Sequence, residues 1–536
     1  MCRTLLHCWG CILLLILLPA IQAATPEQWR SRSIYQLVTD RFALANGSTT
    51  HPCDTGARRY CGGSYRGITN ELDYIQGMGF NAIWISPVVK NIDGFTGWGE
   101  AYHGYWAEDL NRLNPHFGSA EELRELSDAL HRRGMYLMVD VVPNHFAHAG
   151  PVAALDYSGF GEPFATEDAF HEHCWITDWS DQRIVEECWL GDEKVALVDV
   201  DTALPWVQTT MNKWVKELIE TYQIDGIRLD TARHMGRPFL SSFAAAAGVF
   251  TLGEVWHRDP GYTCSYQEQL SGLLNFPLYE VLARTFLTPA ADMRDLAFMI
   301  DIMNAFCIDI TLFGTFSENH DNPRFPSFTS DSSLIANVLT LTIIADGIPV
   351  IYSGQEHQFS ASEDPHNREA IWLSGFSRST RWYTLISKLN QLRNFMPASY
   401  FLEKSRVIYA SPSTIALKKG NMVSILTNSG EASRDRTVIL RRTGWTRGTW
   451  AVDVLTGYLV KVGFFGELRV RVVAGKPRVL FPLAELEGSG ICKDAQIPVL
   501  GGWMQWGGEV LDMVKNGCDA VFGTEAVRLV QIGKGL

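Results

Sequence analysis

Residues that could carry out acid–base chemistry gather in four short segments of the chain. The segments are "YLMVDVVPNH" (136–145), "GIRLDTARH" (226–234), "LGEVWHRDP" (252–260) and "FSENHDNPRF" (316–325). In each segment apolar residues give way to carboxyl and imidazole groups, and the first and last segments also contain amide groups. Burying so many polar groups costs free energy unless each finds a partner, so the clustering indicates a site. The last segment predicts that Glu318, His320 and Asp321 lie at one spot.

Three of these carboxyl groups suit the cleavage of a glycosidic bond. Two carboxyl groups about 5–5.5 Å apart hydrolyse such a bond with retention of configuration, one as nucleophile and one as acid. Arg228 lies two residues before Asp230, so on a strand both point to one face, and a guanidinium keeps a nucleophile ionised. Glu254 lies beside apolar residues, which favour the protonated form of a general acid. We therefore predict Asp230 as nucleophile and Glu254 as acid, with Asp321 holding sugar hydroxyls.

The elements around these residues alternate between strands and helices. Apolar runs predict strands at residues 34–42, 82–89, 136–142, 226–230, 251–255, 314–317 and 349–352. Amphipathic stretches predict helices at residues 119–133, 206–222 and 332–345. About eight such units predict a (β/α)8 TIM barrel, in which the active site lies at the C-terminal ends of the strands. The alternative, a doubly wound sheet, lacks its Gly-rich loop after the first strand.

Two regions depart from the strand–helix alternation. Residues 145–201 contain aromatic and acidic residues but no strand–helix unit, which predicts a small domain inserted after the third strand. After about residue 397 the pattern changes to short strands separated by turns, which predicts an antiparallel β domain. We therefore assign residues 24–144 and 202–397 to the barrel, 145–201 to the inserted domain, 398–492 to the C-terminal β domain and 493–536 to an atypical tail.

The first 23 residues have the pattern of a secretory signal peptide. Arg3 precedes an apolar run from Cys8 to Ala20, and Ala23 supplies a small residue for cleavage. An uncleaved anchor is the alternative, although the run is short for a membrane span. No later segment is apolar enough to cross a membrane, so we expect a secreted, soluble protein. We also expect it to be a monomer. Asn46-Gly47-Ser48 is a glycosylation sequon.

Cysteine usage agrees with secretion. Eight cysteines follow residue 23, and an even number in a secreted chain suggests disulfides. Nearest-neighbour pairing gives 53–61, 174–188, 264–307 and 492–518, although spacing alone does not fix the connectivity. The formal net charge of −13 and a pI of about 5.6 argue against binding nucleic acid or an anionic membrane.

The motifs taken in order resemble the α-amylase family of glycoside hydrolases, and within it the secreted fungal members. The matching stretches are "AYHGYW", "ALHRRGMYLMVDVVPNH", "VEECWLGD", "DGIRLDTARH", "GEV", "ENHDNPRF", "IPVIYSGQE" and "NREAIWLSG". They extend from about Trp29 to Cys492, nearly the whole chain after the signal segment. The resemblance implies an endo-acting enzyme that hydrolyses α-1,4-glucosidic bonds of starch- or glycogen-type glucans.

The resemblance also implies a role for individual residues. Asp230 would be the nucleophile, Glu254 the acid/base and Asp321 the stabiliser of the transition state, with Arg228 beside the nucleophile. Residues lining the subsite of the sugar that forms the covalent intermediate would be His103, Tyr105, Trp106, His145, His320, Asp364 and Arg368. Arg233 and His234 would contact the leaving-group sugar.

A structural Ca²⁺ between the barrel and the inserted domain is a further implication of the resemblance. Asn144 and Asp199 match the side-chain ligands, and Glu186 and His234 match the backbone-carbonyl ligands. Oxygen donors of this mixed kind suit Ca²⁺. The residues have no EF-hand spacing, so the resemblance alone leads to this metal.

The sequence departs from the family pattern at two points. Arg233 stands where a lysine is usual. The planar guanidinium of arginine holds its donors in a fixed fork, whereas the ammonium of lysine is a point charge. Cys492 matches one half of a C-terminal disulfide, but Gly457 falls near the place of the other half, so either Cys518 substitutes for it or the tail from Lys493 is atypical.

Two rival functions remain open at this stage. A glucanotransferase would use the same residues with a sugar as acceptor, and a carbohydrate-binding protein would use none of them catalytically. Related wall-anchored glucanotransferases often lack the histidines that match His145 and His320, so the presence of both favours hydrolysis.

Overall fold

Eight short parallel strands form a sheet in the computed structural model, which describes residues 24–287 and 290–492. The strands are β1 (Ile34–Gln36), β2 (Ala82–Ile85), β5 (Tyr136–Val141), β9 (Gly226–Leu229), β10 (Phe250–Gly253), β11 (Gly272–Leu273), β12 (Gly314–Thr315) and β13 (Ile348–Tyr352). Their order is β11-β10-β9-β5-β2-β1-β13-β12. A parallel bridge between Leu274 and Gly314 joins the two ends of this order and closes the sheet. The predicted (β/α)8 barrel is confirmed.

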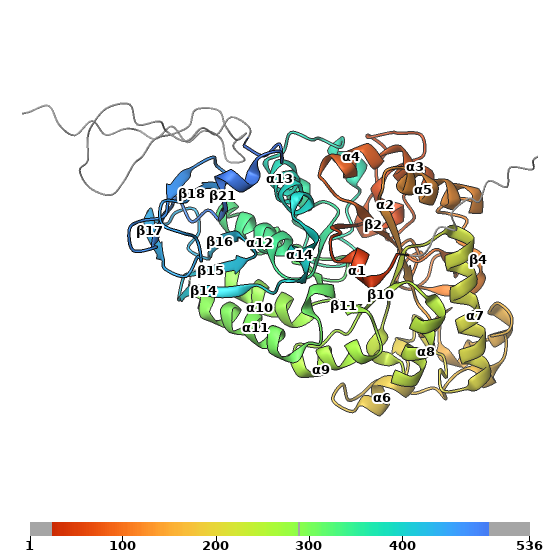
Figure 1. Ribbon diagram of the computed structural model, residues 1–536. Helices are drawn as coiled ribbons and strands as arrows, with labels where there is room; N and C mark the ends of the chain where they lie inside the picture. Colours follow the sequence, from red (N-terminus) through yellow and green to blue (C-terminus); the bar gives the residue numbers. More distant parts are fainter. Residues whose placement is uncertain (1–23, 288–289, 493–536) are drawn as a thin grey trace, which may run out of the picture.

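Helices surround the strands (Figure 1). They include α3 (Tyr65–Asn70), α4 (Leu72–Gly77), α5 (Ala120–Arg132), α7 (Pro205–Tyr222), α8 (Arg237–Ala247), α10 (Phe276–Phe286), α11 (Met293–Phe306), α12 (Ser332–Ile344) and α13 (Arg381–Phe395). Short helices are α1 (Pro26–Trp29), α2 (Thr39–Phe42), α9 (Pro260–Cys264) and α14 (Ala398–Leu402). The sequence of α5 shows why such a segment is helical. Ser119 accepts from the backbone of Glu122, whose side chain bonds back to Ser119, and this capping box starts the helix.

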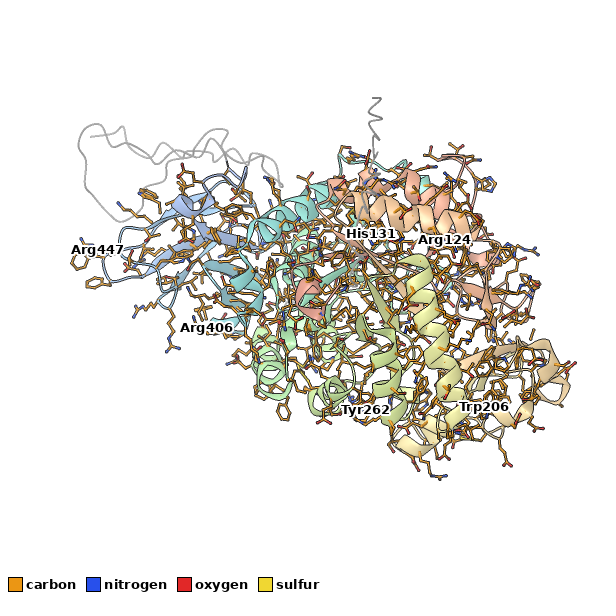
Figure 2. All side chains as sticks on the ribbon, turned by 45° about the vertical axis from the view of Figure 1, so that its right-hand side comes forward. Arg124, His131, Trp206, Tyr262, Arg406 and Arg447 are labelled. Carbon is orange, nitrogen blue, oxygen red and sulfur yellow. A yellow bond between two sulfur atoms is a disulfide. The ribbon has the colours of Figure 1, made fainter. Side chains whose placement is uncertain are left out.

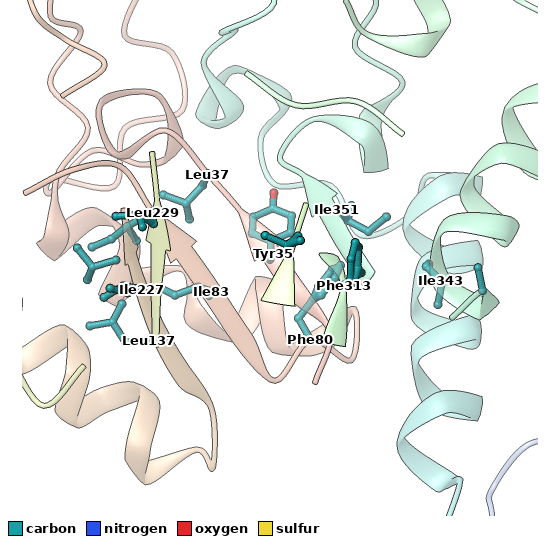
Figure 3. Packing of buried hydrophobic residues seen from close by; sticks show 14 of the residues in the cluster. Tyr35, Leu37, Phe80, Ile83, Leu137, Ile227, Leu229, Phe313, Ile343 and Ile351 are labelled. Carbon is teal, nitrogen blue, oxygen red and sulfur yellow. The ribbon is translucent and has the colours of Figure 1, made fainter. Parts of the chain in front are cut away.

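The alternation of side chains along the strands separates two layers of core. Leu137 packs outward with the helix-side core (Figure 3), whereas Met138 and Leu252 belong to a separate cluster inside the barrel. Side chains two residues apart on a strand share a face. Asp140 and Glu254 lie two residues after Met138 and Leu252, respectively. Their side chains therefore also point into the barrel, beyond the apolar cluster that contains Met138 and Leu252.

Trp29 of α1 closes the opposite, N-terminal end of the barrel. Its ring is fully buried, stacks 5.3 Å from the ring of Phe250, and its indole nitrogen donates to the Asp225 carbonyl at 3.0 Å. A Cβ added to Gly226 would lie 2.7 Å from this ring. Glycine at the start of β9 is therefore required by the packing of Trp29.

A small domain is inserted after β5, as predicted. It contains the antiparallel strands β6 (His145–Ala149), β8 (Val195–Asp199) and β7 (Leu190–Gly191), and the helix α6 (Gln182–Glu187). The disulfide 174–188 lies within it. The rings of Phe164 in this domain and Trp206 in α7 lie 5.9 Å apart, so the domain packs on the start of that helix.

The C-terminal domain is antiparallel, as predicted. One sheet has the order β14-β15-β16-β21-β18-β19 and a second pairs β17 with β20. The bounds are β14 (Arg406–Ser411), β15 (Thr414–Lys419), β16 (Met422–Thr427), β17 (Arg436–Leu440), β18 (Trp450–Asp453), β19 (Leu459–Lys461), β20 (Leu468–Val472) and β21 (Arg478–Pro482). Arg406 and Arg447 mark this domain in Figure 2, at the opposite end of the molecule from Trp206. Where one domain ends and the next begins stays a prediction.

The structure tests the predicted first strand, the predicted disulfides and the expected lack of a membrane span. The predicted strand at 34–42 is wrong beyond Gln36, because Thr39–Phe42 form the short helix α2. The disulfides 53–61, 174–188 and 264–307 are confirmed. The signal segment, the tail and Cys518 lie outside the described residues. Among residues 24–287 and 290–492, no helix is long and apolar enough to span a membrane.

Candidate active site

The C-terminal ends of four barrel strands bring the polar segments together. Asp140 is the next-to-last residue of β5, Asp230 directly follows β9, Glu254 directly follows β10, and Asp321 lies on the segment after β12. The first three of these carboxyl groups are buried, and Asp321 is partly exposed. The barrel therefore places side chains that are up to 181 residues apart in sequence at one end of the sheet.

Arg228 is the centre of this arrangement. Its Nη1 lies 2.6 Å from Asp230 Oδ1 and 3.0 Å from Asp140 Oδ1, and its Nη2 lies 2.8 Å from Glu254 Oε1. Burial alone would lower the pKa of this guanidinium, but the three carboxyl groups raise it well above its ordinary value. Arg228 thus stays charged and fixes both Asp230 and Glu254.

The protonation state of Glu254 is set by burial. Burial raises its pKa from 4.5 to about 8, the Arg228 charge opposes this shift, and the nearby Asp230 and Asp321 add to it. The carboxyl group also accepts a hydrogen bond from the backbone of Thr231 at 2.9 Å. From the sequence we expected an apolar setting for Glu254 and an arginine beside Asp230 alone. In the structure Arg228 contacts both carboxyl groups. Desolvation nevertheless raises the pKa of Glu254 enough to keep it protonated at neutral pH.

Asp321 is held in the opposite state by its neighbours His320, Arg368 and Arg228. Burial raises its pKa, but His320, Arg368 and Arg228 outweigh this effect and leave the pKa below its ordinary value. Arg368 Nη2 donates to Asp321 Oδ1 at 3.2 Å, and His320 Nε2 lies 3.1 Å from Oδ2. Asp321 is therefore an ionised acceptor beside a protonated Glu254.

Neutral imidazoles complete the surroundings of the carboxyl groups. Burial lowers the pKa of His103 and His145, and lowers that of His320 to about 3. The Tyr105 hydroxyl donates to Asp140 Oδ2 at 2.7 Å, and its ring stacks on that of His320 with centroids 5.1 Å apart. The neutral rings suit hydrogen bonds to uncharged hydroxyl groups.

Two cavities open at this end of the barrel. The first has a volume of about 280 Å³ and is lined by Arg58, Trp98, Tyr102, His103, Trp106 and Asp364. The second, of about 430 Å³, is lined by Trp179, Leu190, Asp230, Thr231, Arg233, His234, Glu254, Trp256 and Asp321. Arg368 connects them, because it pairs with Asp321 of the second cavity and with Asp364 of the first at 3.0 Å.

Most residues proposed from the sequence lie at these cavities, but Glu318 does not share the site. It is fully buried, accepts a hydrogen bond from the backbone of Phe325 at 2.5 Å and pairs with Arg324 at 3.6 Å. The expectation that it joins His320 and Asp321 in one place is wrong, because its ion pair with Arg324 directs it into the core.

Some lining residues were not in the predicted set. Trp98 and Trp179 lie on loops with no periodicity, so no sequence signal separated them from other aromatic residues. Asp140 was noted at a strand end, and its hydrogen bonds to Tyr105 and Arg228 make it the support of both.

Asn144 and Asp199, two of the expected metal ligands, contact one another. Asn144 Nδ2 donates to Asp199 Oδ1 at 3.0 Å, and His171 Nδ1 lies 2.7 Å from Asp199 Oδ2. Asn144 lies on the segment after the third barrel strand and Asp199 is the last residue of β8, so their contact joins the barrel to the inserted domain.

The other two expected ligands are the backbone carbonyls of Glu186 and His234, which lie in segments that contact each other. His234 Nδ1 bonds to the Val185 carbonyl at 3.1 Å, which holds the loop after β9 against α6 and its residue Glu186. In the described part of the chain, no three His, Cys, Asp or Glu side chains group to hold a metal. The expected donors are instead one carboxylate, one amide and two backbone carbonyls, and such oxygen donors fit Ca²⁺.

The chain forms a closed (β/α)8 barrel in which one arginine contacts two carboxyl groups beside a cleft lined by indoles and imidazoles. This combination of fold and site is that of a glycoside hydrolase. Comparison with family models narrows this class. The model described as "Alpha amylase, catalytic domain" matches residues 36–242 and 240–421, and the model "Alpha-amylase, domain C" matches residues 407–498. The chain belongs to the α-amylase family of glycoside hydrolases.

Individual relatives agree with this assignment. The chain is 48% identical over 471 residues to alpha-amylase 2 of Schwanniomyces occidentalis, covering 87% of this chain and 92% of that protein. It is 50% identical over 483 residues to alpha-amylase 1 of Lipomyces kononenkoae, covering 88% and 77% of the two chains. A solved α-amylase structure from Malbranchea cinnamomea superposes with a TM-score of 0.86 at 47% identity, covering 88% of this chain and 100% of that one.

Proposed function

We propose that this protein hydrolyses internal α-1,4-glucosidic bonds of starch- and glycogen-type glucans, with retention of configuration. The observation that carries the proposal is the Arg228 guanidinium, which contacts Asp230 and Glu254 at 2.6 and 2.8 Å and holds them at one cleft. The named relatives are α-amylases, which favours hydrolysis over transfer to a second sugar.

The first half of the reaction uses the two carboxyl groups in opposite states. Asp230 attacks the anomeric carbon of the glucose unit on the donor side and forms a covalent glycosyl ester. Glu254 gives its proton to the glycosidic oxygen, so that the leaving chain departs as a neutral alcohol. A buried Glu254 with a raised pKa of about 8 carries that proton at neutral pH.

The second half reverses the roles. Glu254, now ionised, takes a proton from water, and the hydroxide formed attacks the anomeric carbon and releases Asp230 as a carboxylate. Asp321, kept ionised by His320 and Arg368, accepts hydrogen bonds from hydroxyls of the distorted ring. Two inversions at one carbon leave the product with the configuration of the substrate.

The cleft offers contacts on both sides of the scissile bond. On the donor side we assign sugar contacts to His103, Tyr105, Trp106, His145, His320, Asp364 and Arg368. On the leaving-group side we assign Arg233 and His234. The second cavity contains the carboxyl groups and Arg368 connects it to the first, which supports a cleft that accommodates several glucose units of a chain.

A bound Ca²⁺ is part of the proposal. Asn144, Asp199 and the carbonyls of Glu186 and His234 would hold it, and the ion would supply a structural link between the barrel and the inserted domain. The Asn144–Asp199 contact and the position of His234 against α6 support this assignment.

Secretion is proposed on the signal-like start of the sequence and on the disulfides at 53–61, 174–188 and 264–307. Disulfides persist in oxidising compartments outside the cytosol. The sequon at Asn46 lies on an exposed turn, which is compatible with glycosylation.

Product analysis on maltoheptaose tests the proposed reaction. Hydrolysis gives only oligosaccharides shorter than seven units, released first in the α configuration. Products longer than the substrate as the main outcome would identify a transferase instead. No cleavage by folded protein supplied with Ca²⁺ would contradict both enzymatic readings.

A further inference from the structure

Arg233 links the two walls of the second cavity. Its Nη2 donates to the Trp179 carbonyl at 2.5 Å, and its Nη1 donates to the Trp256 carbonyl at 3.4 Å. Trp179 belongs to the inserted domain, and Trp256 lies on the loop after β10, two residues beyond Glu254. One guanidinium therefore ties together backbones that come from two separate parts of the fold.

The two indoles are exposed although their backbones are fixed. The exposed fractions of Trp179 and Trp256 are 52% and 44%, and both residues line the cavity that holds Asp230 and Glu254. Phe276 stacks on one face of Trp256, with ring centroids 5.1 Å apart. Large exposed aromatic rings at a glucan-cleaving centre offer flat surfaces against which sugar rings pack.

The shape of the arginine side chain suits this linking role. A planar guanidinium directs its donors in a rigid fork, whereas an ammonium is a point charge on a flexible stem. Gln182 Nε2 donates to the Arg233 carbonyl at 2.9 Å, so α6 also holds the backbone of the arginine in place. The ring of Tyr262 lies 5.6 Å from the guanidinium carbon and adds a cation–π contact on the barrel side.

We propose that Arg233 is a positioning residue that fixes Trp179 and Trp256 as stacking walls for the glucose units on the leaving-group side. It would thereby determine how many units of a glucan chain occupy that side before cleavage. The inference rests on the proposed function, and it gives the two terminal nitrogens of Arg233 a role toward backbone carbonyls in addition to the sugar contact proposed above.

Maltopentaose labelled at its reducing end tests the proposal, because the labelled product contains the units that occupied the leaving-group side. In Arg233→Lys, the ratio of labelled maltose and maltotriose to labelled glucose should fall roughly three- to tenfold, the loss of one typical hydrogen bond expressed as a ratio. Arg237→Lys is the matched control. Arg237 bonds to the Ser265 carbonyl at 2.9 Å and to Gln269 Oε1 at 3.0 Å, and it is not among the described residues lining the cavity.

A double-mutant cycle separates positioning from general support of the fold. If Arg233 acts through Trp256, Arg233→Lys should change the product ratio much less in a Trp256→Leu background. Additive effects, or a product ratio equal to that of Arg237→Lys, would overturn the proposal. If Arg233→Lys does not fold, Trp179→Ala and Trp256→Ala test the walls, and wild-type ratios in both would overturn it. Wild-type protein that cleaves no glucan would instead contradict the proposed function.

Discussion

Arg228 is the residue on which the two roles of the carboxyl pair depend. It contacts Asp230 and Glu254 equally closely, so the difference between the two groups does not come from the arginine. It comes from the surroundings of Glu254, where desolvation and two neighbouring carboxyl groups hold a proton. A general acid and a nucleophile can thus both contact the Arg228 guanidinium and still differ in protonation state.

The raised pKa of Glu254 predicts how activity depends on pH. Glu254 must be protonated to act as acid, and the protonated fraction falls as the pH rises through about 8. We expect kcat/KM on maltoheptaose to decline with rising pH, with a midpoint near this pKa, because kcat/KM reports ionisations of the free enzyme. Melting curves across the same pH range serve as the control for unfolding. A constant kcat/KM between about pH 6 and pH 10 would refute the assignment.

Residue types and strand positions predicted much of the site. The carboxyl groups at the ends of β5, β9 and β10 and after β12 could be found because apolar runs mark the strands before them. Glu318 could not be separated from His320 and Asp321 by sequence, because only the fold reveals its ion pair with Arg324. The link from Arg233 to Trp179 was also invisible, since it joins a side chain to a backbone carbonyl 54 residues away.

At the scale of elements, short strands limited what the sequence could predict. β11 has two residues, Gly272 and Leu273, which is too few for a pattern of alternation, so no strand was predicted there. The segment after β1 was predicted as strand because Leu37 and Val38 continue its apolar run and Phe42 follows. In the structure Asp40 and Arg41 are buried as an ion pair inside α2, a contact that sequence alone does not predict.

The packing of α1 under the barrel gives a prediction at this scale. Gly226→Ala should reduce the free energy of unfolding by about 1–3 kcal/mol, because its Cβ would overlap the buried Trp29 ring and overpacking costs this much. Denaturant titration measures the change. Gly159→Ala is the control, since a Cβ there meets nothing within 4 Å. Equal stability of the two variants would show that Trp29 does not restrict β9.

At the scale of the whole molecule, the cleft is built jointly by the barrel and the inserted domain. The inserted domain supplies Trp179 and Leu190 to the cavity that contains Asp230 and Glu254. The C-terminal β domain lies at the far end of the molecule (Figure 1) and is not among the described residues that line either cavity. The relative placement of barrel and inserted domain therefore matters for activity.

Calcium should strengthen that placement. We expect a chelator to lower the melting temperature and Ca²⁺ to restore it, because a ligand bound only by the folded state stabilises by roughly 2.7 kcal/mol at a hundredfold excess over its Kd. Asp199→Ala should remove this response, and Asp156→Asn, an exposed helix cap in the inserted domain, should keep it. Melting curves unaffected by chelator, in protein shown by elemental analysis to contain no metal, would contradict the calcium site.

The most direct test of the central claim is the rate of starch hydrolysis by Asp230→Asn and Glu254→Gln. Both changes keep the size of the side chain and remove the carboxyl group that acts as nucleophile or acid. Each should lower kcat by at least about a hundredfold, the lower range for loss of a general acid, while Asp259→Asn, a helix cap on the loop after β10, retains activity. Near-normal turnover by either folded variant would contradict the account.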